Sequence, residues 1–300
     1  MSAFQPETES GSRTCVVVSY WAGLPVDSLH KLLYRMRKIE SGCPFDLLIV
    51  CNGGDQRPLT LPRRLDALKP RILNRENTNY NLGAWDHGWR NAPGYDYYLF
   101  IQDDCLIKEP DWLYGFESRM DLDPGLGLLG EIERSSGMTW DYVGRMTTKP
   151  CGHVGDEWLD INQHILAKFR SHGIPRGKLA NHIPSIILFT SRNVLEKVGG
   201  FRYFGPSKED AIAAEVAFSR EIEALGYRIS KVSDIPFHFI GHAEWRPNGA
   251  VFGRGPAWRI ALREAYWKLK GELKLLLGMR RKPRRLMRCS PVALADELPC

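Results

Sequence analysis

The residues best suited to chemistry in this sequence are two adjacent carboxylates, Asp103 and Asp104. They directly follow an apolar run at residues 97–101, which has the aromatic and aliphatic character of a buried strand. Two carboxylates at the exit of such a strand repel each other unless a cation lies between them. The pair therefore predicts a site for a divalent metal, and the alternative left open is a pair of acidic turn residues in solvent.

A second acidic pair, Glu209 and Asp210, stands where a helix is predicted to begin. Residues 210–225 place apolar side chains near one stripe, and Gly226 ends the pattern as a helix C-cap does. A carboxylate in the first turn can take a proton from a substrate hydroxyl or can simply cap the helix. The sequence alone leaves both interpretations open.

Two histidines, His238 and His242, follow a later apolar segment and offer a nitrogen ligand for the same metal. Gly241, directly before His242, allows the backbone to approach a ligand closely. His242 is therefore the first choice and His238 the alternate, although a single histidine is more often structural than ligating.

These residues need a scaffold, and the sequence predicts an α/β one. Apolar runs typical of buried strands occur at residues 15–20, 45–50, 71–74 and 97–101. Residues 26–39 and 82–90, which lie between these runs, have helical periodicity. Alternation of fully apolar strands with helices predicts a mostly parallel central sheet flanked by helices.

The second half of the chain is less regular. Strands are predicted at residues 183–189 and 227–232, and an amphipathic helix at residues 158–169. In an open parallel sheet, ligands bind beyond the carboxyl ends of the strands. Polar clusters at residues 52–55, 77–81 and 102–104 follow predicted strands, so we expect these three loops to meet on one rim.

Taken in order, these features resemble the family 2 glycosyltransferases of the GT-A fold. The shared motifs are the strand-ending Asp103-Asp104, Gly199-Gly200-Phe201 with Glu209-Asp210 at a helix start, Gly226-Tyr227-Arg228-Ile229, and a downstream histidine. Asn79-Tyr80-Asn81-Leu82-Gly83-Ala84, followed by Gly88, is similar to the Asn-x-Gly loop and helix before the family's metal-binding strand. The resemblance extends over residues 13–245 and rests on the ordered set of motifs.

The resemblance implies a single GT-A-like domain at residues 14–250. Residues 14–125 would form a Rossmann-like half that binds the nucleotide sugar, and residues 126–250 a half that holds the acceptor and the catalytic base. Residues 1–13 are expected to be a disordered leader, and residues 251–300 a basic amphipathic helix and tail.

The activity implied by the resemblance is metal-dependent transfer of a sugar, with inversion, from a nucleotide-diphosphate sugar to a hydroxyl of a glycan or lipid-linked acceptor. Such a reaction would serve surface glycan, polysaccharide or glycolipid synthesis. Asp104 would ligate Mn²⁺ or Mg²⁺ that bridges the diphosphate, Asp103 would contact the ribose or the metal shell, and His242 or His238 would add a ligand. Asp210, or with less support Glu209, would be the general base.

Further residues are implied to bind the nucleotide sugar. They are Ser19 and Tyr20 after the first strand, Asn52 and Asp55 after the second, and Asn81 and Gly83 in the Asn-x-Gly loop. Asp55 lies later than the family pattern places its nucleobase contact. Gln102 replaces the first Asp of an Asp-x-Asp triplet, which implies weaker metal dependence. Trp85, Trp140 and Trp158 are candidates for stacking on sugar rings.

The composition limits the other possibilities. The net charge of +6 arises from six basic residues at positions 280–288, so the rest of the chain carries as many basic as acidic residues and does not indicate a nucleic-acid binder. Scattered single cysteines and the lack of an apolar run of membrane-spanning length favour a cytoplasmic protein. Residues 257–277 are typical of an amphipathic helix, which would either pack on the domain or bind an anionic membrane surface peripherally, on the cytoplasmic face.

Two other functions remain as alternatives. A nucleotidyltransferase acting on sugar phosphates also needs an α/β sheet, a metal and strand-end carboxylates, but the expected Gly-rich phosphate loop is replaced by Ser19-Tyr20-Trp21-Ala22-Gly23. A non-catalytic nucleotide-binding or membrane-binding protein would not need Asp103, Asp104 and Asp210 together.

Overall fold

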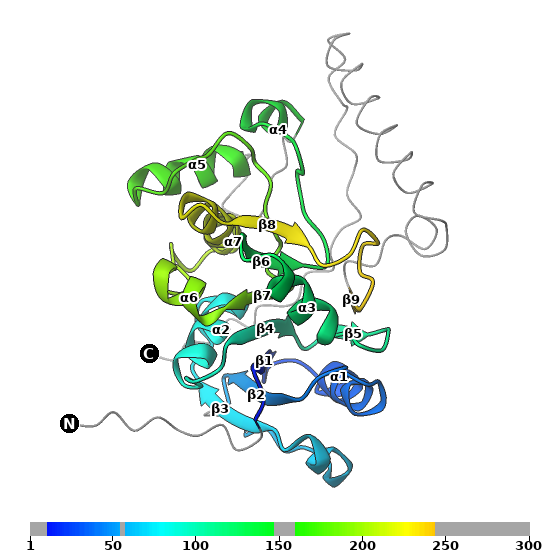
Figure 1. Cartoon of the computed structure of the whole chain (residues 1–300). Coiled ribbons are helices and arrows are strands. Elements are labelled where there is room, and N and C mark those ends of the chain that lie inside the picture. The colour runs from blue at the N-terminus through cyan, green and yellow to red at the C-terminus, as the bar shows by residue number, and fades with distance from the viewer. Residues whose placement is uncertain (1–10, 55–57, 147–159, 244–300) are drawn as a thin grey trace, which may run out of the picture. The chain divides into compact units, whose positions relative to one another are not determined.

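A seven-stranded sheet forms the centre of the protein. The computed structural model describes residues 11–54, 58–146 and 160–243 (Figure 1). The sheet has the order β3-β2-β1-β4-β7-β6-β8. Its strands are β1 (Thr14–Trp21), β2 (Phe45–Asn52), β3 (Arg71–Arg75), β4 (Tyr97–Gln102), β6 (Leu126–Gly130), β7 (Ile187–Ser191) and β8 (Arg228–Lys231). The predicted fold class, an α/β domain with a mostly parallel central sheet flanked by helices, is confirmed.

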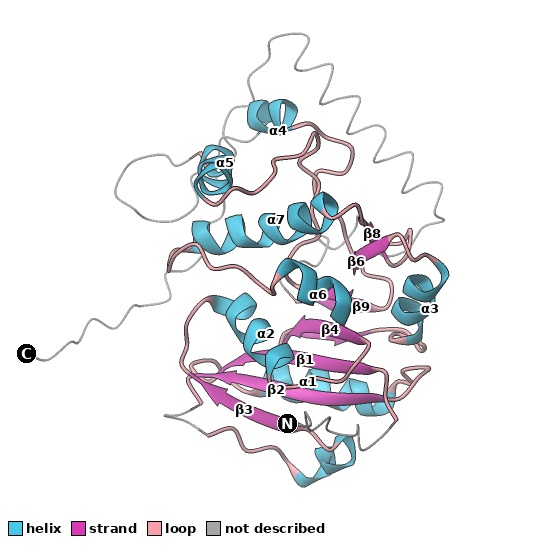
Figure 2. Ribbon diagram, turned by 60° about the vertical axis from the view of Figure 1, so that its left-hand side comes forward, coloured by secondary structure: helices cyan, strands magenta, loops and turns pink. Residues whose placement is uncertain are grey.

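Helices cover both faces of this sheet. They are α1 (Asp27–Lys38), the 3₁₀ helix η1 (Arg63–Leu68), α2 (Tyr80–Arg90), α3 (Tyr114–Leu122), α4 (Trp140–Met146), α5 (Ile161–Ser171), α6 (Arg192–Val198) and α7 (Lys208–Ala224). Helices α1 and α3 contribute to the core on one face, and α2, α6 and α7 to the core on the other. Figure 2 shows α1 and α2 on opposite sides of the strands. Helix α5 packs outside α7.

The central position of β1 in the sheet explains the apolar run in its sequence. It pairs in parallel with β2 on one side and with β4 on the other. Val16 and Val18 point into the core beside α1, whereas Val17 points into the core beside α2. Neither face of β1 is in contact with water. The strand therefore does not alternate between polar and apolar residues, as a strand with one solvated face would.

The second half of the sheet departs from the parallel pattern. Strand β7 runs antiparallel to both β4 and β6, and β6 pairs in parallel with β8. The strand predicted at residues 183–189 begins only at Ile187, because the preceding amides bond to side chains of α7: Ile183 N donates to Ser219 and Ser185 N donates to Glu215.

A small second sheet was not predicted. Strands β5 (Cys105–Ile107) and β9 (Ile240–His242) pair in antiparallel register, with Cys105 opposite His242. Each strand has only three residues, which is too short for a periodic signal. Their pairing brings the end of the described chain beside the residues that follow β4.

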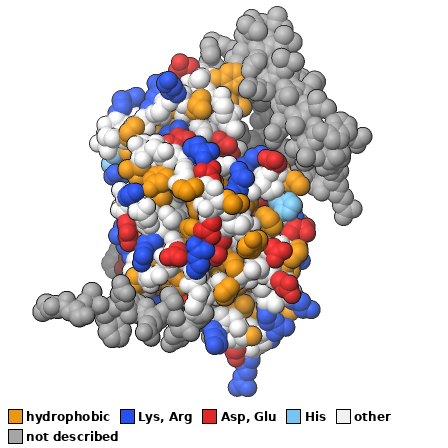
Figure 3. All heavy atoms as spheres, in the orientation of Figure 1, with side chains coloured by type: hydrophobic (Ala, Val, Ile, Leu, Met, Phe, Trp, Pro, Cys, Tyr) orange, Lys and Arg blue, Asp and Glu red, His pale blue; other side chains and the backbone are white. Residues whose placement is uncertain are grey.

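The surface of the protein carries charges of both signs. On the face drawn in Figure 3, basic and acidic side chains are interspersed, as expected where the charges nearly balance. None of the described helices is both long and apolar enough to cross a bilayer.

Arg13 was expected to belong to a disordered leader, but it pairs with Asp96 and Asp121 at 3.2 and 2.9 Å. The rest of that leader up to residue 10, Asp55, Trp158 and the tail at residues 251–300 lie outside the described residues.

Candidate metal centre and active site

The pairing of β5 with β9 places His242 beside Asp104. His242 Nε2 lies 2.8 Å from Asp104 Oδ1, and the two side chains are 1% and 23% exposed. The backbone carbonyl of Asp104 also accepts a hydrogen bond from Ala243 N at 3.1 Å, which ties the two segments together. Asp104 and His242, both predicted from the sequence as metal ligands, are therefore in contact.

Asp104 fits a cation ligand. Its Oδ1 is buried and makes no hydrogen bond among the described residues, although His242 Nε2 lies 2.8 Å away. A buried carboxylate oxygen without a hydrogen bond is unfavourable, and a cation would satisfy it. A carboxylate oxygen with an imidazole nitrogen is a donor set that suits Mn²⁺. The residues present therefore fit a divalent metal.

Cys105 lies in the same group. Ligand atoms of Asp104, Cys105 and His242 are all within 4.8 Å of one another. The Cys105 sulfur, however, lies 3.6 Å from the carbonyl oxygen of Ile186, and burial raises the pKa of the thiol well above its ordinary value. Mn²⁺ and Mg²⁺ prefer oxygen and nitrogen ligands to sulfur, so Cys105 suits these cations less well than Asp104 and His242 do.

Two other predicted metal residues lie outside this group. Asp103 donates its backbone N–H to the carbonyl of Ser19 at 3.1 Å. Burial, and then repulsion by Asp104, raises the pKa of the Asp103 carboxyl to about 7. His238 is half-buried, and its ring stacks edge-on against Phe239. Neither Asp103 nor His238 joins Asp104 and His242 in the group that could hold a metal.

Glu131 holds the segment that leads to His242. Its Oε1 accepts hydrogen bonds from Phe239 N and Ile240 N at 3.1 and 2.7 Å. Burial raises the pKa of the Glu131 carboxyl to about 8. Lys108 supports the same segment by donating to the carbonyl of Phe237. Sequence analysis missed Glu131, because nothing in its irregular surroundings marks it as buried.

Ser185 joins the predicted loops on the rim. Its carbonyl oxygen accepts hydrogen bonds from Asn81 Nδ2 and, at 2.8 Å, from Gln102 Nε2. Its own N–H and hydroxyl donate to Glu215 Oε2 at 2.7 and 2.6 Å. Gln102 Oε1 in turn lies 3.1 Å from His242 Nε2. The loops after β3 and β4 therefore do meet on one rim, as predicted.

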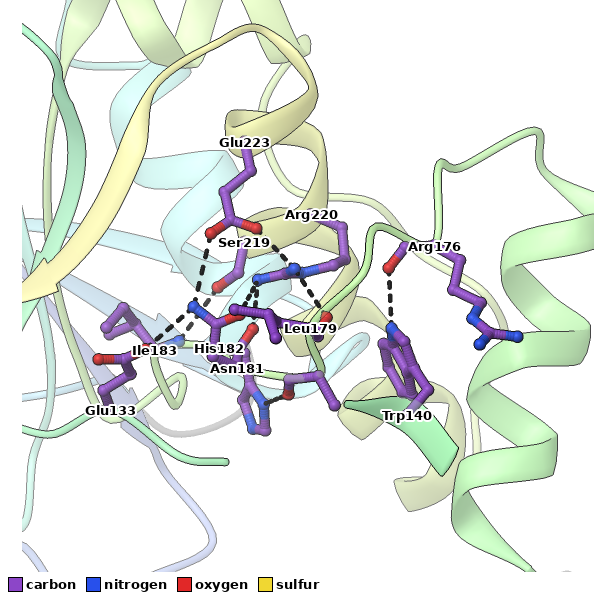
Figure 4. A network of polar contacts seen from close by, with 11 residues as sticks. Glu133, Trp140, Arg176, Leu179, Asn181, His182, Ile183, Ser219, Arg220 and Glu223 are labelled. Carbon is purple, nitrogen blue, oxygen red and sulfur yellow. Dashed lines mark hydrogen bonds and ion pairs between the residues drawn. The ribbon is translucent and has the colours of Figure 1, made fainter. Parts of the chain in front are cut away.

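A buried network anchors the chain just before Ser185 (Figure 4). Arg220 on α7 donates to the carbonyl of Leu179 at 2.9 Å and to Asn181, and pairs with Glu223 at 2.6 Å. Ile183 N donates to Ser219 on the same helix. These contacts fix residues 179–183 against α7 and so set the position of Ser185.

Four further predicted nucleotide-binding residues lie at the carboxyl ends of β1 and β2 or in the helix that follows β3. Ser19 and Tyr20 are buried, and the Tyr20 hydroxyl donates to the carbonyl of Leu24 at 2.9 Å. Asn52 accepts from Arg75 at 3.0 Å and donates to the carbonyl of Tyr80 at 3.3 Å. Gly83 lies where a Cβ would collide with Asn79 and the carbonyl of Thr78, so glycine permits the tight turn there.

The start of α2 is conformationally strained. Asn79 and Tyr80 both have left-handed backbone conformations, with φ of 60° and 53°. Two consecutive non-glycine residues in this region are unfavourable and occur mostly at functional sites. Burial, followed by the charges of Glu209 and Asp210, raises the pKa of the Tyr80 hydroxyl. The strained turn therefore lies near the second acidic pair.

That second pair does not cap the helix. Ser207 is the N-cap of α7, and its hydroxyl oxygen accepts a hydrogen bond from Asp210 N at 3.1 Å. The Asp210 carboxylate instead faces α5, with Lys168 Nζ at 2.7 Å and His164 Nε2 at 3.0 Å. The capping interpretation is therefore excluded for Asp210, which leaves the carboxylate available for chemistry.

The surroundings of Asp210 keep it ionised. Burial alone would raise the pKa of Asp210, but hydrogen bonds from Lys168, Ser207 and His164 outweigh burial and lower it. Gly205, at φ 148°, leaves the space that Asp210 Oδ2 occupies. Sequence analysis missed Lys168 and His164, although their spacing of four places both on one face of the predicted helix.

Glu209 is also buried beside Asp210. It is 4% exposed, and its Oε1 has no hydrogen-bond partner among the described residues.

Two of the tryptophans suggested for stacking on sugar rings are unsuited to that role. Trp85 is fully buried between Phe100 and Phe201, and Trp140 is 4% exposed and donates to the carbonyl of Arg176 at 2.9 Å. Both belong to the core, which corrects that expectation.

Comparison with known proteins finds matches only among solved structures. No protein-family model matches the chain, and no curated protein matches it. Among solved structures it is similar to the mannosyltransferase PcManGT from Pyrobaculum calidifontis in complex with GDP-Man and Mn²⁺. The two are 17% identical, the match covers 89% of this chain and 74% of that chain, and the TM-score is 0.47. The function proposed below therefore rests on the residues of the site.

Proposed function

We propose that the protein is a metal-dependent glycosyltransferase that moves a sugar, with inversion, from a nucleotide-diphosphate sugar to an acceptor hydroxyl. The observation that carries the proposal is the buried Asp104 Oδ1, which makes no hydrogen bond among the described residues and lies 2.8 Å from His242 Nε2, just beyond the carboxyl end of β4. Ligands bind at this edge in open α/β sheets, and a nucleotide diphosphate is a ligand that needs a cation there.

Asp104 and His242 would hold the cation, Mn²⁺ or Mg²⁺. A cation bound there would neutralise the charge that develops on the diphosphate leaving group. Asp103, beside Ser19 on the same edge, would face the ribose or the metal shell. Ser19, Tyr20, Asn52, Asp55, Asn81 and Gly83 are proposed to bind the nucleotide sugar.

Asp210 is the proposed general base. The acceptor hydroxyl oxygen forms a bond to the anomeric carbon while the bond to the diphosphate breaks on the opposite face, and the hydroxyl proton passes to the Asp210 carboxylate. A single displacement of this kind inverts the anomeric configuration. Lys168 and His164 orient Asp210 and keep it ionised at neutral pH. A positioned base typically contributes about 10²- to 10⁴-fold in rate.

Glu209 is the alternate base, because its Oε1 is buried without a partner next to Asp210. The acceptor is proposed to be a glycan or a lipid-linked sugar, in surface glycan, polysaccharide or glycolipid synthesis. Peripheral contact of the tail with an anionic membrane on the cytoplasmic side belongs to the same proposal.

Turnover of a donor panel tests the base assignment. Release of the nucleoside diphosphate would be followed from UDP, GDP, CDP and dTDP sugars with Mn²⁺, for the wild type, Asp210→Asn and Glu209→Gln. Asp66→Asn is the matched control, since Asp66 is an exposed carboxylate on η1. We expect Asp210→Asn to lower kcat about 10²-fold or more while donor binding stays within about twofold.

The control is expected to keep wild-type turnover. A larger loss of kcat in Glu209→Gln than in Asp210→Asn would identify Glu209 as the base. Wild-type kcat in both variants would show that the general base does not lie on α7. Transfer of a nucleotidyl group to a sugar phosphate would replace the proposal with the nucleotidyltransferase alternative.

A further inference from the structure

Gln102 faces the candidate metal site. Its Oε1 lies 3.1 Å from His242 Nε2, and that nitrogen lies 2.8 Å from Asp104 Oδ1. An amide oxygen, an imidazole nitrogen and a carboxylate oxygen therefore converge at one place. Sequence analysis treated Gln102 as a departure from the family pattern and gave it no role.

The orientation of the Gln102 amide is fixed by its other end. Gln102 Nε2 donates to the carbonyl oxygen of Ser185 at 2.8 Å, and this oxygen can only accept. The amide nitrogen must therefore point to Ser185, and the amide oxygen must point to His242. Asn81 donates to the same carbonyl, and Glu215 anchors the Ser185 amide and hydroxyl.

Glu215 holds Ser185, and through it the Gln102 amide, in a fixed position. Its carboxylate is half-buried and lies 3.4 Å from His182 Nε2, and it accepts hydrogen bonds from both Ser185 donors. These hydrogen bonds lower the pKa of Glu215 despite its burial, so it is an ionised acceptor. Outer-shell partners of this kind commonly orient the ligands of a metal.

We propose that Gln102 Oε1 is the third protein ligand of the divalent cation, together with Asp104 Oδ1 and His242 Nε2. The inference rests on the metal site of the proposed function. Side-chain amide oxygens are ordinary ligands of hard cations. Without metal, His242 Nε2–H donates to Gln102 Oε1; as a ligand, Nε2 presents its lone pair, and the ring proton lies on Nδ1. On metal binding, the contact between the two residues would be replaced by a bond from each of them to the cation.

Cys105 is the competing third ligand. Its sulfur lies within the same group, but the thiol donates to the carbonyl oxygen of Ile186 at 3.6 Å and so is directed at the backbone. A set of one carboxylate, one imidazole and one amide carries a single negative charge. The imidazole favours Mn²⁺ over Mg²⁺, which prefers oxygen ligands, so the site should select Mn²⁺.

Binding of Mn²⁺ alone to the full chain tests the ligand role. Free Mn²⁺ would be measured by electron paramagnetic resonance during titration of the wild type, Gln102→Leu and Cys105→Ala, with folding checked by circular dichroism. We expect Gln102→Leu to raise the Kd for Mn²⁺ at least about tenfold and Cys105→Ala to change it less than about twofold. Wild-type affinity in folded Gln102→Leu would overturn the assignment.

A second variant covers the case in which Gln102→Leu does not fold. Gln102→Glu keeps an oxygen at the same reach and adds a charge, so its Kd for Mn²⁺ should fall below that of the wild type. An unchanged or higher Kd would count against Gln102 as a ligand.

The failure of this inference and that of the proposed function are distinguishable. If the folded wild type binds no Mn²⁺, both the metal site and the ligand assignment fail. If Mn²⁺ binds and is lost in Gln102→Leu while no sugar nucleotide is turned over, the ligand assignment stands and the proposed activity fails.

Discussion

The carboxylate of Asp210 on α7 lies 2.7 Å from the ammonium group of Lys168 on α5. This contact joins two helices that each contribute to the second half of the protein, and it involves side chains that are 9% and 25% exposed. Lys168 also donates to the carbonyl of Phe204, directly before Gly205. One lysine therefore fixes both the carboxylate and the turn that makes room for it.

Replacing Lys168 with Met should shift the pH dependence of turnover. Asp210 must be ionised to accept a proton, and Lys168 helps to hold its pKa below the ordinary value. Loss of the lysine raises that pKa, so the acid limb of the kcat/KM profile should move to higher pH. Lys168→Arg should keep the limb near its wild-type position. If the acid limb of Lys168→Met stays at the wild-type pH, Asp210 does not accept the proton in the rate-determining step.

Gly205→Ala should impair turnover more than stability. A Cβ at residue 205 would collide with Asp210 Oδ2, and the carboxylate would have to move. Small displacements of a reacting group can lower rates by about 10²-fold. Gly226→Ala is the matched control, because Gly226 also has a positive φ, 88°, but nothing lies within 4 Å of the added Cβ.

The control variant is expected to lose about 1 kcal/mol of unfolding free energy through its left-handed backbone and to keep its kcat. Equal loss of kcat in both variants, measured beside urea unfolding, would attribute the effect of Gly205→Ala to general destabilisation.

Glu131 should make the protein less stable as the pH rises. Its pKa is about 8 in the folded protein against 4.5 ordinarily, so the folded state holds a proton that the unfolded state has lost between these values. The free energy of unfolding therefore falls from about pH 4.5 to 8. Glu131→Gln should flatten this part of the profile in urea unfolding, whereas Glu196→Gln on the surface should not. Parallel profiles for the wild type and Glu131→Gln would show that Glu131 does not change protonation over this range.

Arg220→Met should destabilise the fold strongly. The Arg220 side chain is 2% exposed, and its removal leaves Glu223 and the carbonyls of Leu179 and Asn181 without their donor (Figure 4). We expect a loss of about 3 kcal/mol in urea unfolding. Arg192→Met removes a comparable pair with Glu196 on the surface and should lose less than about 1 kcal/mol. Similar losses in both variants would contradict the structural role of the network.

Much of the first half of the fold could be predicted from sequence. The strands β1, β2 and β4 are buried on both faces, so their apolar runs are continuous and distinct from the periodic pattern of α1. Asp103 and Asp104 were identified because they directly follow one of these runs. The antiparallel direction of β7 could not be predicted, since an apolar strand carries no mark of its direction.

Site residues could be predicted only where the residue type itself indicates a chemical role, as for a carboxylate or an imidazole. Asp104 and His242 were named, but their contact depends on β5 and β9, which are too short to give a pattern. Lys168, Ser185 and Glu215 act through the partners that the fold gives them. An isolated lysine or serine in a sequence does not reveal which carboxylate or carbonyl it will contact.

Calorimetric titration with nucleotide-diphosphate sugars tests the central claim most directly. The full chain and its Asp104→Ala variant would be titrated with the donor panel in Mn²⁺ and in EDTA. We predict that one donor binds the wild type in Mn²⁺, and that binding weakens strongly in EDTA and in Asp104→Ala. If the folded wild type binds none of these donors in Mn²⁺, or binds one equally well in EDTA, the account of a metal-dependent glycosyltransferase is contradicted.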